Sequence, residues 1–415
     1  MKRFFMGLTP RLAMFFAVFG PATITAISDN DAAGVATYSL AGAKFGYSML
    51  FPLLLITILL AVTQEMGVRI GIVTGKGLGD IIRERYGIKV ALLMFCLLFI
   101  ANMGTIVANF SALKTTSVMF NIPTIPFIIL VVVFAFIFVT QGNYEINQRI
   151  FLIGILLYFS YVISAVKSNP NWHLALTSLV NPGNIQVSKD YIITAIAVLG
   201  TTITPWGQFF IQSFINDKKL SVEKLKFSQV ETYFGALLTD FFSFFMIIAT
   251  AATLFVNKIP LTSGEQASLS IRPFAGELAG VLFGVGLLNA AIMGIIIISL
   301  STAYAFSEFF GYEGSLDTPY NRGKLFYGIF LFQLIIAALI VMLPSISLFK
   351  VVVYSQSLNA VILPVILYFL IKITNNKELM GEYTNNKWYN YISVIATIVI
   401  IFAAIFAVTS SLFNF

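Results

Sequence analysis

Two aspartates, Asp29 and Asp31, lie two residues apart inside an apolar segment that is long enough to cross a lipid bilayer. On a continuous helix their side chains would point about 200° away from each other. Only an unwound segment could aim both inward, and the small residues 32–34 would let the backbone bend and a ligand approach. An Asp at the centre of a membrane helix costs about 3 kcal/mol, so a positive charge is needed to offset the pair. The pattern therefore predicts a metal-ion site, with Asn30 as a further candidate ligand.

A second apolar segment is interrupted at residues 200–207, which read GTTITPWG. Pro205 has no N–H to donate to the carbonyl four residues earlier, so the Thr201 carbonyl becomes a candidate metal ligand. Thr204 lies beside the proline, and Gln208 follows Thr204 by one helical turn. Both side chains add candidate oxygen ligands.

The two interruptions offer carboxylate, carbonyl, hydroxyl and carboxamide oxygens, and no thiolate, thioether or imidazole. Oxygen-only sites suit hard ions such as Mg²⁺, Ca²⁺ and Mn²⁺, and Mg²⁺ usually keeps several of its waters. The small residues Ala32, Ala33 and Gly34, together with Gly207, would leave room for those waters. Glycine and proline alone could simply kink packed membrane helices, but their combination with Asp29 and Asp31 favours an ion site.

The composition defines the class of protein that holds these residues. With 58% hydrophobic and 10% charged residues, the chain belongs to the membrane class. Its net charge of +7 comes from Lys and Arg scattered through short loops rather than from one basic face, so nucleic acid is excluded as a partner. The single histidine, His173, and the lack of an HExxH motif make a membrane-embedded enzyme a poor interpretation.

Eleven apolar segments are long enough to be transmembrane helices. Most of the 25 Lys and Arg residues fall on one side if the N-terminus is cytoplasmic, which places the C-terminus outside. We therefore expect a multi-pass protein of the plasma membrane of a prokaryotic cell. The expected spans are residues 12–40, 46–70, 90–119, 123–141, 148–166, 190–215, 230–256, 275–310, 325–343, 348–372 and 390–412.

The two interruptions occupy matching places if spans six to ten repeat spans one to five. Interrupted helices at corresponding positions of two halves indicate the binding site of a secondary transporter. Spacing and hydropathy, rather than residue similarity between the halves, support this interpretation. It gives a single transmembrane domain, 1–415, with repeat one at about 12–166, repeat two at about 190–372 and an extra helix at about 390–412.

Several motifs run in register with one family of transporters. They are Gly20-Pro21 with Asp31 eleven residues after Gly20, then Ala36-Thr37, KFGYS at 44–48, GIVTGKGL at 71–78, RERY at 83–86 and LMG at 379–381. On these residues the chain resembles the natural resistance-associated macrophage protein (Nramp) family of divalent-metal transporters. The resemblance implies an all-α integral membrane protein of the leucine-transporter-type fold, with about 11 transmembrane helices. These form two inverted five-helix repeats plus one helix, with helices 1 and 6 broken.

Departures from the family pattern fall at functional positions. The family's DPGN motif is Asp31-Ala32-Ala33-Gly34 here, so the metal-binding aspartate carries over to Asp31 while the asparagine ligand becomes Gly34. The family's Met-Pro-His is Thr204-Pro205-Trp206, so the thioether and the histidine tied to proton coupling are missing. Trp206 could line the ion site or pack behind it.

Other positions carry over from the resemblance. Asn109 stands where the family has a glutamate on its proton route, and the family's carbonyl and glutamine ligands map onto Thr201 and Gln356. Asp240, inside the seventh span, could be a structural anchor or part of an aqueous pathway. The pattern is similar to a divergent branch, the Nramp-related magnesium transporters, which carry Mg²⁺ and Mn²⁺ through a wider site without proton coupling.

We therefore expect a transporter that imports Mg²⁺ and Mn²⁺ by alternating access without proton coupling, and that binds the metal as substrate with no cofactor. The alternatives are a proton-coupled Mn²⁺/Fe²⁺ symporter, with Asp29 standing in as proton acceptor, and an amino-acid carrier on the same fold. Divalent metal ions and the lipid bilayer are the expected partners. The sequence leaves the oligomeric state open, and a monomer would suffice.

Overall fold

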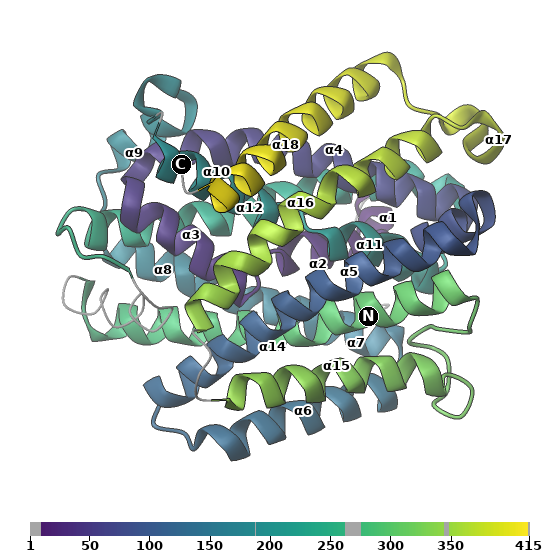
Figure 1. Cartoon of the computed structure of the whole chain (residues 1–415), viewed down its shortest axis with the longest axis horizontal. Helices are drawn as coiled ribbons and strands as arrows, with labels where there is room; N and C mark the ends of the chain where they lie inside the picture. The colour runs from purple at the N-terminus through teal and green to yellow at the C-terminus, as the bar shows by residue number, and fades with distance from the viewer. Residues whose placement is uncertain (1–9, 187, 262–274, 344–347, 414–415) are drawn as a thin grey trace.

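The computed structural model of the chain describes residues 10–186, 188–261, 275–343 and 348–413. Within these ranges every regular element is helical (Figure 1). Nine helical stretches there are long and apolar enough to cross a membrane, or ten if the bent pair Leu358–Thr374 and Lys377–Tyr383 counts as one span. The all-α membrane class predicted from the sequence is confirmed.

The helices follow the order of the predicted spans. The first half comprises α1 (Pro10–Val18), α2 (Pro21–Ser28), α3 (Ala32–Phe45), α4 (Leu50–Thr74), α5 (Leu78–Met119), α6 (Thr124–Gln141), α7 (Tyr144–Leu157) and α8 (Phe159–Lys167). The second half comprises α9 (Trp172–Val180), α10 (Lys189–Thr202), α11 (Pro205–Lys218), α12 (Leu225–Thr250), α14 (Glu277–Phe310), α15 (Lys324–Met342), α16 (Leu348–Thr374), α17 (Lys377–Met380) and α18 (Lys387–Phe413). Short helical turns link them at η2 (Gly46–Met49), η3 (Pro182–Asn184), η4 (Val222–Lys224), η5 (Ala251–Phe255) and η6 (Gly381–Tyr383).

Each of the eleven predicted spans corresponds to a helix or to a pair of half-helices. The count is ten rather than eleven because the first two predicted spans are joined through η2 into one apolar stretch, Ala32–Thr74, and it is nine when the bent pair that contains part of α16 is left out. The predicted breaks also occur where expected, between α2 and α3 and between α10 and α11. The limits of the two repeats remain a prediction.

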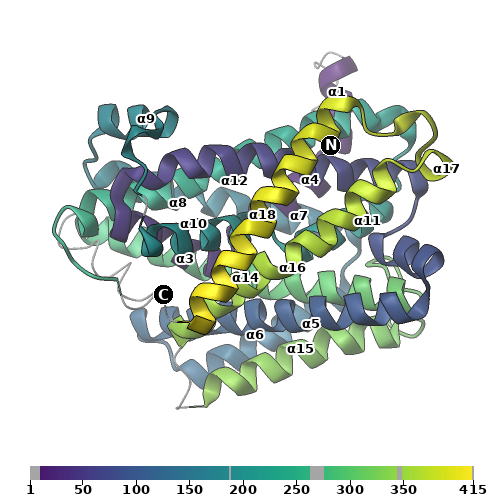
Figure 2. The same ribbon diagram turned by 45° about the horizontal axis from the view of Figure 1, so that its top comes forward.

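The half-helices lie inside the molecule. In Figure 2, α5, α6, α14 and α15 lie together on one side and α4 and α12 on the other, with α3, α10 and α11 between them, and α2 packs against α12. Gly235 of α12 lets α2 approach closely, because a Cβ at that position would lie 2.9 Å from Thr23 Cα. The interior position of the half-helices is what buries the two breaks.

A further bend precedes the first break, where α1 meets α2 at Phe19 and Gly20. Gly20 has a φ of 140°, a conformation that side-chain-bearing residues rarely adopt. Glu231 of α12 accepts hydrogen bonds from the backbone N–H groups of Gly20 at 2.8 Å and Thr23 at 3.0 Å through the same carboxylate oxygen. The Lys218 ammonium donates to the Phe19 carbonyl at 2.5 Å. Two charged side chains therefore satisfy backbone groups that the bend leaves without helical partners.

We expect Glu231→Ala to lower the stability of the fold by about 1–3 kcal/mol, because it leaves two N–H groups at the bend without their acceptor. Thermal unfolding of the purified protein in detergent measures this as a lower unfolding temperature. Glu231→Gln keeps an acceptor oxygen and should recover most of the loss. Glu223→Ala, which removes an exposed glutamate of η4, is the matched control. Equal unfolding temperatures for Glu231→Ala and the wild type would contradict this role.

Candidate metal centre

The first break places two carboxylates at the junction of two half-helices. α2 ends at Ser28, and Asp31 forms the N-cap of α3 by accepting a hydrogen bond from Gly34 N–H at 2.7 Å. Asp29 and Asp31 are 1% and 2% exposed. An N-cap aspartate is stabilised by the helix dipole as well as by this hydrogen bond. The carboxylate predicted as the main metal ligand is therefore held by the start of α3.

The second break meets the first through a side-chain hydrogen bond. α10 ends at Thr202, and Thr204 is the N-cap of α11, accepting from Gly207 N–H at 3.2 Å. The Thr204 hydroxyl donates to Asp29 Oδ1 at 2.7 Å. Thr201 belongs to the last turn of α10, where helix carbonyls lack intrahelical partners. The structure thus brings Asp29, Thr201 and Thr204 into one region.

Asn109 of α5 binds the other aspartate. Its Nδ2 amide donates to Asp31 Oδ2 at 2.7 Å and to the Thr105 carbonyl at 2.9 Å. Its Oδ1 accepts from the backbone N–H of Ala32 at 3.0 Å. A neutral carboxamide therefore sits beside Asp31 at the position where the resemblance implied a glutamate in other family members.

Gly34 and Gly207 allow the two breaks to approach each other. A Cβ at Gly34 would lie 2.6 Å from the Asp29 carbonyl oxygen and 3.2 Å from Thr201 Oγ1. At Gly207 it would lie 2.9 Å from Thr204 Oγ1 and 3.4 Å from Asp29 Oδ1. A side chain at either glycine would therefore collide with atoms of the breaks, and the room for metal-bound waters at these positions stays a prediction.

Gln356 reaches the edge of this region because α16 packs against α10. A Cβ at Gly200 would lie 2.5 Å from the Gln356 carbonyl oxygen. Gln356 Oε1 accepts from Asn359 Nδ2 at 3.2 Å, and the same amide reaches Thr105 Oγ1 at 3.4 Å. Gln356 is therefore not hydrogen-bonded to Asp31. It is connected to that residue only indirectly, through Asn359 and residues of α5.

Three predicted residues have other surroundings. Asn30 donates to the Thr239 carbonyl at 2.8 Å and accepts from Ser243 Oγ at 2.7 Å, so its side chain anchors the first break to α12. Gln208 and the Trp206 indole N–H are buried and have no hydrogen-bond partner in the described part of the chain. Their roles as ligand and pathway residue stay predictions, and the bonds of Asn30 favour anchoring over ligation.

Asp240 of α12 is a third buried carboxyl near the break. It is 5% exposed, and its carboxyl group faces the hydroxyl-bearing side chains of Thr57 and Ser243. Asp29 lies close enough to interact electrostatically with both Asp31 and Asp240. The described residues nevertheless form no cluster of three or more His, Cys, Asp or Glu side chains that could hold a metal ion. A bound cation would thus need carbonyl, hydroxyl or carboxamide oxygens besides Asp29 and Asp31.

Two residues that support the aspartates were not predicted. Gln64 of α4 donates to Asp29 Oδ2 at 3.3 Å, and its presence inside an apolar helix was the available signal. Gly294 of α14 lies against both Asp31 and Asn109, since a Cβ there would lie 2.8 Å from Asp31 Cβ and 2.5 Å from Asn109 Oδ1. A glycine in a long apolar helix gave no such signal.

Two half-helix pairs that meet at buried carboxylates define a membrane transporter of the leucine-transporter-type fold. The structure is similar to that of a manganese transporter from Eremococcus coleocola bound to an aromatic bis-isothiourea substituted compound. The TM-score is 0.81 at 19% identity, covering 97% of this chain and 87% of that one. MhsT in complex with L-phenylalanine also matches, with a TM-score of 0.62 at 14% identity over 97% of this chain and 98% of that one. At these identities, the two likenesses show the fold alone.

The sequence comparison identifies the family. The family described as natural resistance-associated macrophage protein-like matches residues 22–410, so this chain belongs to the Nramp family, whose members are transporters rather than enzymes. A Staphylococcus aureus (strain JH9) protein named divalent metal cation transporter MntH is 23% identical over 399 residues. These cover 91% of this chain and 88% of that protein. The predicted family and the multi-pass membrane class are confirmed.

We expect Gly294→Ala to weaken metal binding roughly tenfold or more, because the added methyl group forces Asn109 and Asp31 apart and such overpacking costs about 1–3 kcal/mol. Isothermal titration of the purified protein with Mn²⁺ measures the affinity. Gly328→Ala is the matched control, since a Cβ at that position of α15 meets no heavy atom within 4 Å. Unchanged affinity in Gly294→Ala would mean that the Asp31–Asn109 geometry does not control binding.

Proposed function

We propose that this protein imports Mg²⁺ and Mn²⁺ across the plasma membrane of a prokaryotic cell by alternating access and without proton coupling. The observation that carries the proposal is the pairing of Asp29 and Asp31 at the junction of the broken helices, joined to the second break by the Thr204–Asp29 hydrogen bond. Two carboxylates that are ionised inside a membrane require a cation or tight hydrogen bonding to be tolerated. A divalent ion matches their combined charge.

The chemistry of the site supports hard divalent ions. The residues at the two breaks offer only oxygen ligands, and Thr204 and Trp206 stand where a thioether and an imidazole would favour softer metals. Relatives named as divalent metal and manganese transporters support a divalent cation as substrate. We therefore propose both Mn²⁺ and Mg²⁺ as transported ions.

The burial of the site supports alternating access. Asp29, Asp31, Thr201, Thr204 and Gln356 are each no more than 3% exposed, so an ion can reach them only when the surrounding helices move. An inside-negative membrane potential contributes about 2.3 kcal/mol per charge per 100 mV, and a divalent ion gains about twice that. Inward movement would need no second driving ion.

The surroundings of Asp31 support the absence of proton coupling. Asn109, which binds Asp31 directly, cannot release a proton in the physiological range, and the only histidine, His173, lies in α9 with an exposed side chain. The alternative is a proton-coupled Mn²⁺/Fe²⁺ symporter in which Asp29 accepts the proton. The two mechanisms differ in whether metal uptake acidifies the compartment that receives the metal.

We expect liposomes containing the purified protein to take up Mg²⁺ under an inside-negative potential without acidification of the lumen. Asp31→Asn should slow uptake roughly tenfold or more, because it removes one of the two charges that bind the ion. Asparagine is also a good N-cap, so the start of α3 should stay intact. A Mg²⁺-sensitive dye and a pH-sensitive dye inside the vesicles report the two quantities.

The matched control is Asp190→Asn, which neutralises an exposed aspartate in the first turn of α10. It should transport like the wild type. Metal uptake that is matched by proton entry would favour the symporter. No uptake of Mg²⁺ by folded wild-type protein that does take up Mn²⁺ would overturn the magnesium assignment.

We expect Thr204→Met to raise the ratio of Mn²⁺ to Mg²⁺ uptake, because a thioether binds Mn²⁺ better than it binds the harder Mg²⁺. Thr204→Leu is the matched control, since it removes the same hydroxyl and adds similar bulk without sulfur. Competition between the two ions in the same liposome preparation gives the ratio. If leucine shifts the ratio as far as methionine does, loss of the Asp29 hydrogen bond rather than ligand softness is the cause.

A further inference from the structure

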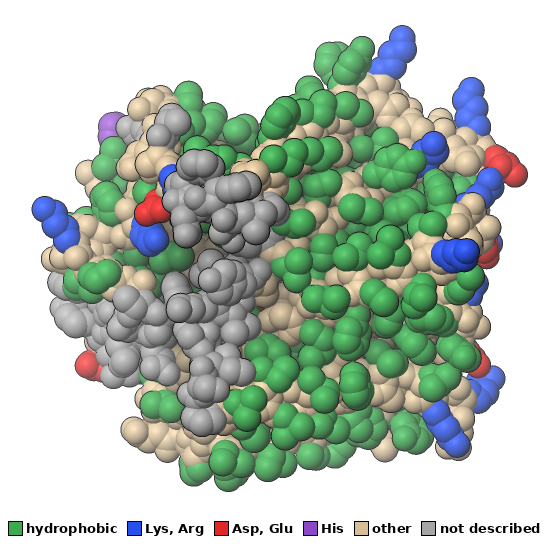
Figure 3. Space-filling model, viewed as in Figure 1, with side chains coloured by type: hydrophobic (Ala, Val, Ile, Leu, Met, Phe, Trp, Pro, Cys, Tyr) green, Lys and Arg blue, Asp and Glu red, His purple; other side chains and the backbone are tan. Residues whose placement is uncertain are grey.

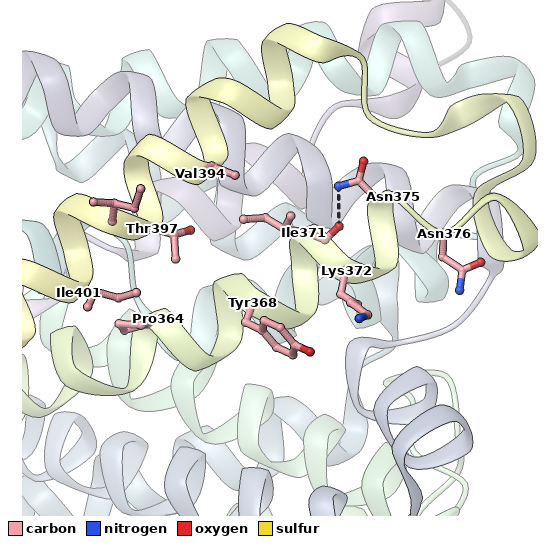
Figure 4. A pocket seen from close by; sticks show the side chains of 10 residues that line it. Pro364, Tyr368, Ile371, Lys372, Asn375, Asn376, Val394, Thr397 and Ile401 are labelled. Atoms are coloured by element: carbon pink, nitrogen blue, oxygen red, sulfur yellow. Dashed lines mark hydrogen bonds between the residues drawn. The ribbon is translucent and has the colours of Figure 1, made fainter.

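A groove of about 570 Å³ runs between α16 and α18 on the surface of the protein, away from its interior (Figure 4). Its long wall is apolar and consists mainly of Pro364, Ile371, Val394, Ile398 and Ile401. The Thr397 hydroxyl in this wall donates to the Ser393 carbonyl at 2.8 Å, so its polarity is satisfied within α18. The wall therefore suits a hydrocarbon chain.

One end of the groove is polar and positively charged. Lys372, Asn375 and Asn376 gather there, at the end of α16. The Lys372 ammonium lies 5.9 Å from the centre of the Tyr368 ring and forms no ion pair in the described part of the chain. Glu378, a nearby carboxylate on α17, is bound to Arg85 at 2.7 Å. The positive charge of Lys372 is thus left for a partner outside the chain.

Hydrogen bonds join α16 to α18 at the polar end of the groove. The carboxamides of Asn375 and Asn390 exchange two hydrogen bonds, each of 2.8 Å. Asn375 Nδ2 also donates to the Ile371 carbonyl at 2.9 Å, as drawn in Figure 4. These bonds fix the spacing of α16 and α18 beside Lys372, so the groove has a defined width at its polar end.

The position of the groove in the membrane identifies the occupant. α17, which follows the polar end, lies at the edge of the molecule where Lys and Arg side chains gather in Figure 3. The distribution of basic residues in the sequence predicts that this edge is cytoplasmic. Anionic lipids of the inner leaflet carry a negative headgroup at this depth and hydrocarbon chains below it.

We propose that this groove binds one anionic phospholipid, with its phosphate at Lys372 and an acyl chain along the apolar wall between α16 and α18. Charge complementarity at one end and hydrocarbon contact along the rest favour a lipid over a free phosphate, because a free phosphate has no apolar part that could pack against the wall. Neither the metal site nor its specificity enters this inference.

Native mass spectrometry of the full-length protein tests the proposal, with phosphatidylglycerol and phosphatidylcholine of identical acyl chains as probes. The wild type should retain one phosphatidylglycerol several-fold more strongly than phosphatidylcholine. Lys372→Gln should remove the preference by removing the charge, and Ile398→Trp should reduce binding of both lipids by filling the groove. Lys324→Gln, which neutralises an exposed lysine at the start of α15, is the matched control and should behave like the wild type.

Equal retention of the two lipids by the wild type would overturn the proposal, and so would a preference that survives Lys372→Gln. A protein dimer that dissociates with Ile398→Trp would instead assign the groove to a second copy of the chain. Thermal unfolding of the variants, measured in parallel, should match that of the wild type, which confirms that they are folded.

Discussion

The structure depends on one constraint: two carboxylates buried in a membrane protein must be satisfied where no solvent reaches them. Each aspartate at the first break is held by a different part of the molecule, Asp29 by Thr204 and Gln64, and Asp31 by Asn109 and the start of α3. These bonds tie the first half-helix pair to α4, α5 and α11. The same oxygens that an ion would use thus also hold the helices in place, which makes ion binding and helix arrangement parts of one equilibrium.

Much of this arrangement could be predicted from the sequence, because its signals are local. Charged residues, prolines and glycines inside apolar segments located both breaks, and apolar length located the spans. The pairing of the breaks followed from the spacing and hydropathy of the two halves, and Asp31 as N-cap of α3 agrees with the unwound segment that the Asp29 and Asp31 spacing required.

The remaining features depend on contacts between residues far apart in the chain, and no local sequence pattern predicts such contacts. Glu231 supports a bend more than 200 residues away, and Gly294 is needed only because Asp31 and Asn109 pack against it. Asn30 was predicted as a ligand because it stands between two aspartates, but both the nitrogen and the oxygen of its carboxamide are hydrogen-bonded to α12. At Gly34 the sequence could not show that the missing side chain admits the backbone of Asp29, which lies 2.6 Å from where a Cβ would be.

Two of the three side-chain hydrogen bonds of Asn109 bear on how a bound ion would change the site. Its amide nitrogen binds Asp31 Oδ2 while its carbonyl oxygen binds the N–H of Ala32, so one side chain joins α5 to both the carboxylate and the backbone of the first break. An ion that approaches Asp31 Oδ2 from the side of this amide would compete with it for that oxygen, whereas the bond to the Ala32 N–H would remain. The attachment of α5 to the first break would then rest on the backbone bond, so the surroundings of Asn109 would differ between the ion-free and the ion-bound site.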